Sequence, residues 1–120
     1  MSRHDVEIRL QHILDAAREA VAFASPRKRA DLDSDRLLNL ALMRLLEIIG
    51  EAATRVPDAE RKKRPAIPWP QIVGMRNRLI HGYDNVNFDT LWDIVTKDLP
   101  PLIANLKLAL ARRPRRKRSQ

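Results

Sequence analysis

The sequence contains no cysteine among its 120 residues. This absence excludes disulfide bonds, thiolate metal sites and a cysteine nucleophile. Only three glycines are present, which leaves little turn chemistry for a fold of many strands. Aromatic residues are also scarce, with two Phe, two Trp and one Tyr, so the core must be built mainly from Leu, Ile, Ala and Val. We therefore predict a single all-α domain.

Long apolar runs are missing as well. No stretch approaches the roughly 18 consecutive apolar residues that a membrane-spanning helix requires. The first ten residues include Arg3, Asp5, Glu7 and Arg9 and no apolar run, so we expect no conventional signal peptide. From these two observations we expect a cytoplasmic protein.

Positive charge is concentrated at the C-terminal end. The formal net charge is +8, yet residues 112–120 hold six of the 23 basic residues and no acid, leaving 17 basic against 15 acidic residues elsewhere. Such a tail attracts polyanions through counterion release, although a solvated, disordered terminus explains it equally well. We predict a helical domain over residues 1–111 and a disordered basic tail over residues 112–120. The candidate nucleic-acid contacts in the tail are Arg112, Arg113, Arg115, Arg116, Lys117 and Arg118.

The first half of the chain predicts two helices, because apolar residues recur there at three- or four-residue steps. The first spans residues 4–23 and ends before Pro26. The second begins near Asp33 or Ser34, either of which could be its N-cap, and ends at about Arg55. It is apolar over more than one face, so we expect it to be the most buried helix.

The second half predicts two further helices. Residues 58–68 are charged and interrupted by proline, which is typical of a loop with one short helical turn at most. A third helix carries Pro70 in its first turn and ends at Gly82, as a left-handed residue after the helix. A fourth follows Asn87 as its cap and restarts or kinks near Pro100. The pattern predicts a bundle of four to five helices.

Two of the three glycines, Gly50 and Gly74, fall inside predicted helices. Glycine there costs up to ~1 kcal/mol relative to alanine. We favour the interpretation that the second and third helices cross closely at these positions, where a side chain would hold them apart. Simple tolerance of both glycines is the alternative.

The candidate chemistry lies in the third helix. Arg76 and His81 are five residues apart, or roughly 140° around an ideal helix. An arginine can hold the non-bridging oxygens of a phosphodiester, and a histidine that titrates near neutral pH can exchange protons with an attacking 2′-hydroxyl and a leaving oxygen. This chemistry needs no metal, and His4, His12 and His81 have no metal-ligand spacing. From spacing alone, an Arg and a His at a helix end are more often capping or interface groups.

The same residues stand in a longer motif. Residues 76–83 read Arg76-Asn77-Arg78-Leu79-Ile80-His81-Gly82-Tyr83. This resembles the signature of the HEPN superfamily, and specifically of its HepT-like toxins: Arg, a polar residue, three further positions, His, any residue and Tyr. The resemblance extends over about residues 5–110. Family-like flanking segments are residues 46–53, 67–69, 89–95 and 98–100.

The resemblance implies a homodimeric HEPN-type bundle and a metal-independent endoribonuclease that cleaves tRNA or mRNA and uses no cofactor. Arg76 and His81 would be its catalytic residues, in a composite cleft between two protomers, with Asn77 as an orienting neighbour. Tyr83 would accept AMP from an MntA-like nucleotidyltransferase, the antitoxin of a type VII-like toxin–antitoxin system. Arg78 stands outside the signature and is either a second phosphate contact or a solvated helix residue.

Two other functions stay open. HEPN domains also occur as non-catalytic, nucleotide-binding partners of nucleotidyltransferases. The intact Arg76, His81 and Tyr83 argue against such a degenerate copy. A basic DNA-associated regulator is the third interpretation, supported only by the tail, since no helix-turn-helix pattern is evident.

Overall fold

The computed structural model describes residues 2–79 and 86–111. Within these residues the chain forms helices and no β-strand, which confirms the all-α prediction. His81, Gly82, Tyr83 and the basic tail lie outside the described residues. The helices are α1 (Arg3–Ala24), α2 (Asp31–Ser34), α3 (Arg36–Thr54), α4 (Asp58–Lys62), α5 (Trp69–Val73), α6 (Met75–Leu79), α7 (Phe88–Asp93), the π-helical turn η1 (Ile94–Asp98) and α8 (Leu99–Ala111).

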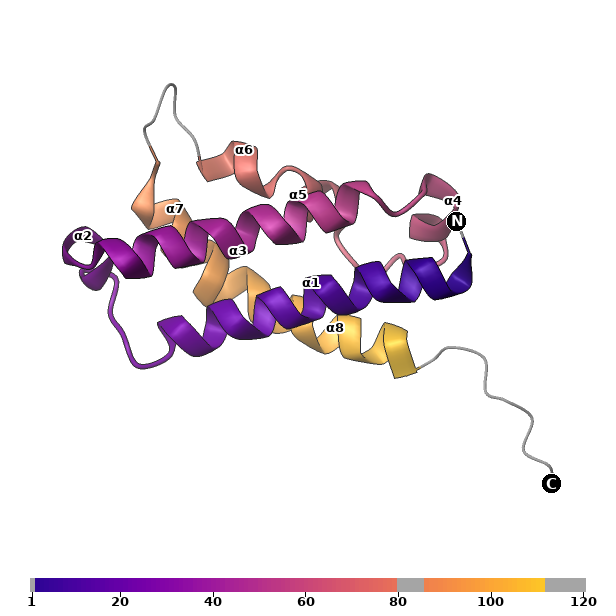
Figure 1. Cartoon of the computed structure of the whole chain (residues 1–120), viewed down its shortest axis with the longest axis horizontal. Helices are drawn as coiled ribbons and strands as arrows, with labels where there is room; N and C mark the ends of the chain where they lie inside the picture. Colours follow the sequence, from indigo (N-terminus) through magenta and orange to yellow (C-terminus); the bar gives the residue numbers. More distant parts are fainter. Residues whose placement is uncertain (1, 80–85, 112–120) are drawn as a thin grey trace.

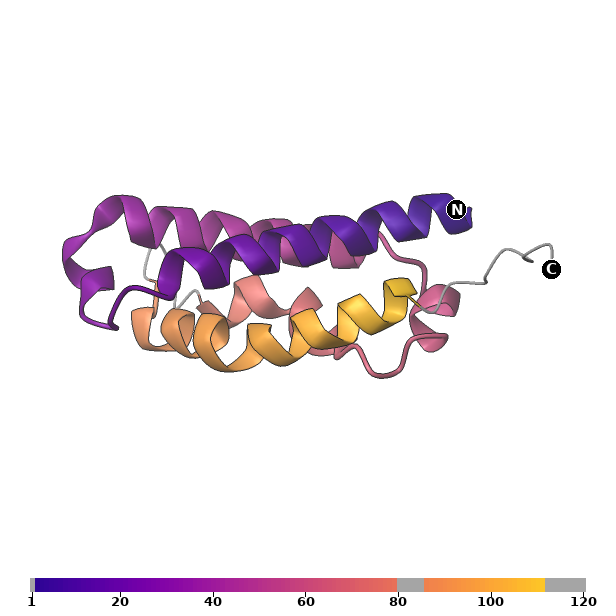
Figure 2. The same cartoon turned by 90° about the horizontal axis from the view of Figure 1, so that it is seen from below.

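The helices are arranged in two layers (Figures 1 and 2). The long helices α1 and α3 lie antiparallel and side by side in one layer. The second layer holds α5, α6 and the continuous run from α7 through η1 to α8, and α8 packs along α1. The four predicted helical regions correspond to α1, α3, the α5–α6 pair and the α7–η1–α8 run, with α2 and α4 as short additions.

Leu, Ile, Ala and Val build the core as predicted, with Trp69 and Met75 as the exceptions among its buried members. Helix α3 buries nine residues, more than any other described helix, as its apolar pattern predicted. It nevertheless leaves the side chains of Leu37 and Leu40 exposed, at 80% and 42%. None of the described helices is long and apolar enough to cross a membrane.

The predicted start of the second helix is wrong. Asp33 and Ser34 belong to the separate turn α2, and the N-cap of α3 is Asp35, whose carboxylate accepts the Leu38 N–H at 3.0 Å. This hydrogen bond lowers the pKa of Asp35 below its ordinary value. Asp, Ser and Asp in succession are all good N-caps, so only the backbone conformation decides between them.

The predicted third helix is interrupted. Gly74 separates α5 from α6, with φ −85° and ψ 4°, near the sparsely allowed region between helix and strand. A Cβ atom at Gly74 would lie 3.2 Å from the Pro70 carbonyl oxygen, so the break suits a residue without a side chain. Pro70 lies in the first turn of α5, as predicted. The predicted helix end at Gly82 lies outside the described residues.

The predicted close crossing is confirmed at Gly50. A Cβ atom there would lie 3.3 Å from the carbonyl oxygen of Ile72 and 3.7 Å from that of Val73, both on α5. The same prediction is wrong for Gly74, where the nearest atom belongs to Pro70 of the preceding turn. Gly50 therefore lets α5 approach the backbone of α3.

The last helical run begins and shifts where the sequence predicts. The Asn87 side chain accepts the N–H three residues further on at 3.0 Å and caps α7. Pro100 and Pro101 lack an N–H, so the helical ladder cannot continue unchanged into α8. The Leu99 N–H donates to the Ile94 carbonyl five residues before it, which forms the π-helical turn.

Candidate functional site

Arg76 and Asn77 lie on α6 and line a shallow depression against α3, with a volume of about 470 Å³. We call it the α3–α6 depression. Arg76 and Asn77 point outward because Met75 and Leu79, on either side of them in α6, are buried, so the residues between face away from the core. The other residues that line it are Arg44, Glu47, Gly50, Glu51, Thr54 and Val73.

Arg76 has one ionic partner in the described structure. Its Nε lies 3.7 Å from Oε2 of Glu47 on α3. The Arg76 side chain is 61% exposed, and that of Glu47 is 38% exposed. One nitrogen of the guanidinium therefore faces Glu47, while most of the side chain stays accessible to a ligand.

Arg78 occupies a different side of α6 from Arg76. Its Nη1 lies 3.1 Å from Oδ2 of Asp98 in η1, and the same oxygen accepts a hydrogen bond from Gln71 at 3.3 Å. Arg78 does not line the α3–α6 depression. Its described role is to tie α6 to η1, and contact with RNA stays a prediction.

His81 and Tyr83 belong to residues 80–85, outside the described part of the chain. The flanking residues are joined, because the Asn87 N–H donates to the Leu79 carbonyl at 2.8 Å. His81 follows Leu79, the last residue of α6, by two positions. The structure thus describes Arg76 and Asn77 together and leaves the other half of the motif as a prediction.

The residues that α3 contributes to the depression were not predicted from the sequence. Arg44, Glu47 and Glu51 follow one another at steps of three and four residues, so they share one face of the helix. A charged stripe on a helix that is otherwise apolar was the available signal. These charges line the depression only because α6 lies opposite them, and the sequence pattern does not show that arrangement.

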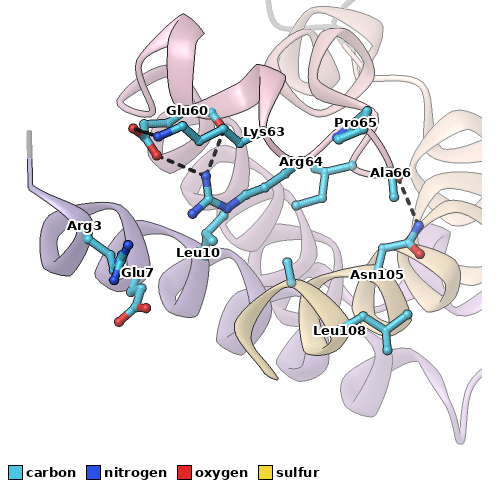
Figure 3. A pocket seen from close by; sticks show the side chains of 12 residues that line it. Arg3, Glu7, Leu10, Glu60, Lys63, Arg64, Pro65, Ala66, Asn105 and Leu108 are labelled. Carbon is cyan, nitrogen blue, oxygen red and sulfur yellow. Dashed lines mark hydrogen bonds and ion pairs between the residues drawn. The ribbon is translucent and has the colours of Figure 1, made fainter. Parts of the chain in front are cut away.

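A second depression, of about 610 Å³, lies where α1 begins and α8 ends (Figure 3). Lys63 and Arg64 both pair with Glu60, at 3.1 and 3.2 Å, and Asn105 donates to the Ala66 carbonyl at 3.1 Å. None of the described residues predicted for the site lines it. The motif residues Arg76 and Asn77 line the α3–α6 depression instead, so that depression is the candidate site.

No metal centre is found in the part of the chain that the structure describes. Among residues 2–79 and 86–111, no group of three or more His, Cys, Asp or Glu side chains is placed to hold a metal ion. The polar side chains that line the α3–α6 depression carry guanidinium, carboxylate, amide and hydroxyl groups.

Residues 13–109 match a protein-family model described as "Ribonuclease HepT-like". A Methanocaldococcus jannaschii protein named "Putative RNase" is 36% identical over 102 residues, covering 85% of this chain and 94% of the relative. A Caldanaerobacter subterraneus subsp. tengcongensis protein of the same description is 37% identical over 98 residues, covering 82% and 88%. A Thermococcus cleftensis protein named "Probable ribonuclease HepT" is 40% identical over 72 residues, covering 60% and 66%. No solved structure matches the chain.

Proposed function

Because this chain belongs to the HepT-like ribonuclease family, we propose that it is a metal-independent endoribonuclease, the toxin of a type VII-like toxin–antitoxin system. The observation that carries the proposal is the exposed pair Arg76 and Asn77 in the α3–α6 depression, which precede His81 by five and four residues in the sequence. The motif that they begin is complete in the sequence. The substrate class is RNA, either tRNA or mRNA.

Arg76 holds the scissile phosphate in this proposal. Its guanidinium is exposed and offers paired N–H donors that match the non-bridging oxygens. Negative charge on these oxygens grows as the phosphorus is attacked, and a fixed cation stabilises that charge more in the transition state than in the ground state. Asn77 orients the same group from the adjacent position.

His81 moves the proton. It removes the proton of the 2′-hydroxyl, whose oxygen then forms a bond to phosphorus while the bond to the 5′-oxygen breaks. The imidazolium returns a proton to the leaving 5′-oxygen, so the products are a cyclic phosphate and a 5′-hydroxyl. A histidine suits both steps because its ordinary pKa lies near neutral pH.

The active form in this proposal is a homodimer. Leu37 and Leu40 form an exposed apolar pair on α3, and Arg44 of the depression lies one turn beyond Leu40. A second copy that covers the two leucines would bring its own depression next to the first. This arrangement is the composite cleft that the resemblance implies.

The proposed antitoxin is an MntA-like nucleotidyltransferase that transfers AMP to the hydroxyl of Tyr83. Tyr83 is two residues from His81, so the modification adds bulk and negative charge where the RNA phosphate binds. A Tyr83→Phe variant should stay toxic in the presence of the nucleotidyltransferase and should gain no mass on incubation with that partner and ATP.

The basic tail, residues 112–120, adds RNA affinity without taking part in the chemistry.

The deciding experiment is expression of the wild type, His81→Ala and His12→Ala from a tight promoter, followed by growth and by integrity of tRNA and mRNA. His12 is an exposed histidine on α1 and serves as the matched control. We expect growth arrest and cleaved RNA with the wild type and His12→Ala only. Purified His81→Ala should cleave about 10²–10⁴-fold more slowly. Cleavage by the wild type should persist in EDTA.

The opposite result assigns the other function. If all three proteins are harmless and purified wild type leaves RNA intact, the nuclease proposal fails. Retained binding to the nucleotidyltransferase would then identify the chain as a non-catalytic partner.

A further inference from the structure

Glu47 lies between two arginines that come from different helices. Its Oε1 accepts from Nη1 of Arg44, one turn earlier on α3, at 3.4 Å. Its Oε2 lies 3.7 Å from Nε of Arg76 on α6. One carboxylate therefore contacts two guanidinium groups, one through each oxygen, and all three side chains line the α3–α6 depression.

These contacts contribute little to the stability of the fold. The Arg44 and Arg76 side chains are 70% and 61% exposed, and ion pairs in water are strongly screened. What the carboxylate does supply is geometry. It gives the two guanidinium groups a shared contact, one at each carboxylate oxygen.

Glu51, the other acid of the depression, differs from Glu47. Its Oε2 pairs with Arg55, on its own helix, at 3.0 Å. Arg55 does not line the depression, so this pair does not join α3 to α6. Among the described acidic residues of the depression, Glu47 is the one whose ion pairs bridge the two helices.

We propose that Arg44 is a second phosphate-binding residue of the RNA site and that Glu47 is a positioning residue that holds Arg44 and Arg76 at one opening. This inference rests on the proposed ribonuclease function. Each arginine uses one nitrogen toward Glu47, and a guanidinium has five N–H donors, so donors remain for phosphate. Arg76 takes the scissile phosphate and Arg44 a phosphate of a neighbouring nucleotide.

The proposal predicts opposite effects on catalysis and on substrate binding. The Glu47 charge repels RNA while it orders the arginine that stabilises the transition state. Glu47→Gln should therefore lower kcat about tenfold, because a displaced guanidinium no longer meets the reacting phosphate, and should leave KM unchanged or lower it. A merely structural role would not separate kcat from KM in this way.

Arg44→Gln should show the complementary result. Loss of a charge-assisted contact to a phosphate should raise KM about tenfold, with kcat close to that of the wild type. The dependence of log affinity on log salt concentration should become shallower by about 0.7 for a single strand.

The experiment uses the purified full-length chain, a single-stranded RNA oligonucleotide and its non-cleavable 2′-deoxy analogue. Asp58→Asn is the matched control, because it also removes one acid of an exposed ion pair, with Lys62 on α4 at 3.5 Å, outside the depression. It should leave kcat, KM and the salt dependence unchanged. Glu47→Asp keeps the charge but is too short to reach both arginines, so it should lower kcat as Glu47→Gln does.

The outcomes separate this inference from the function on which it rests. If the wild type cleaves RNA and both Glu47 variants match it in kcat and KM, the positioning role is overturned while the nuclease stands. If the wild type does not cleave RNA, the nuclease proposal fails. Binding of the 2′-deoxy analogue still tests whether Arg44 contacts a phosphate. Equal affinity and equal salt dependence of Arg44→Gln and wild type would overturn that site.

Discussion

Asn39 is the buried polar side chain among the described residues, with 4% of its surface exposed. Its Nδ2 donates to the Leu32 carbonyl at 3.0 Å, and its Oδ1 accepts from Arg36 at 3.3 Å. The first bond ties the α2 turn to the start of α3. The buried amide contributes to stability by donating a hydrogen bond to this carbonyl, because a buried carbonyl without a partner has lost its hydration and gained nothing in return.

Asn39→Ala should destabilise the protein by about 1–3 kcal/mol, since it leaves the buried Leu32 carbonyl without its donor. Asn105→Ala is the control, because Asn105 also donates to a backbone carbonyl, that of Ala66, at an exposed site. Water replaces the donor there, so a loss below about 1 kcal/mol is expected. Urea unfolding measures both, and equal losses would contradict the role given to burial.

Arg76 and Arg78 show how little a residue type says about its role. Both are exposed on α6, yet one faces the α3–α6 depression and the other pairs with Asp98. Two residues along a helix are about 200° apart, so neighbouring arginines meet different surroundings. Their separate partners lie on other elements, which only the folded chain brings near.

At the scale of elements, the contact between α3 and α5 positions the site. Gly50 removes the side chain that would stand between the helices, and α6 follows directly after α5. The distance between Glu47 and Arg76 therefore depends on how closely α5 can approach α3.

Gly50→Val should destabilise the fold by about 1–3 kcal/mol, because the added side chain meets the backbone of α5 and overpacks the crossing. Ala22→Val places the same residue at an exposed position of α1, away from the depression, and should cost less than about 1 kcal/mol, which is the difference in helix propensity. Thermal unfolding gives both values. RNA cleavage by folded Gly50→Val should also fall, because α6 moves away from α3. If Gly50→Val had the stability and activity of the wild type, the helix crossing would tolerate a side chain at this position.

At the scale of the whole molecule, dimerisation should depend on the exposed leucines of α3. Leu37→Glu places a charge in the proposed interface, where its desolvation is unfavourable, and should convert a dimer into a monomer. Leu108→Glu is the control, because Leu108 is also exposed, at 58%, but lies on α8. Light scattering after size exclusion gives the molar mass. A monomeric wild type, or a dimeric Leu37→Glu, would contradict the proposed interface.

The basic tail acts through charge alone in the proposed function. Deleting residues 112–120 removes six cations and should weaken RNA binding. The slope of log affinity against log salt should become shallower by up to about 4 for a single strand. The cleavage step itself should keep the wild-type kcat. A truncated protein with unchanged affinity and slope would show that the tail does not contact RNA.

The sequence by itself determined the helical class, the order of the main helices and the caps and breaks that depend on near neighbours. The Asn87 cap and the shift before Pro100 belong to this group, because a cap or a missing N–H acts within one or two turns. The motif also named Arg76 and Asn77, which line the α3–α6 depression, while their roles in the chemistry stay predictions. All of this rests on short-range periodicity and chemistry.

Only the tertiary structure decided which charges face one another. The pairing of Arg76 with Glu47, the pairing of Arg78 with Asp98 and the close approach at Gly50 all join residues from different helices. For these contacts between helices, local propensities allowed several arrangements of similar free energy, and packing between distant segments selected one of them. The break at Gly74 and the Asp35 cap involve the near neighbours Pro70 and Leu38, but they too depend on the backbone conformation, which the sequence pattern left open.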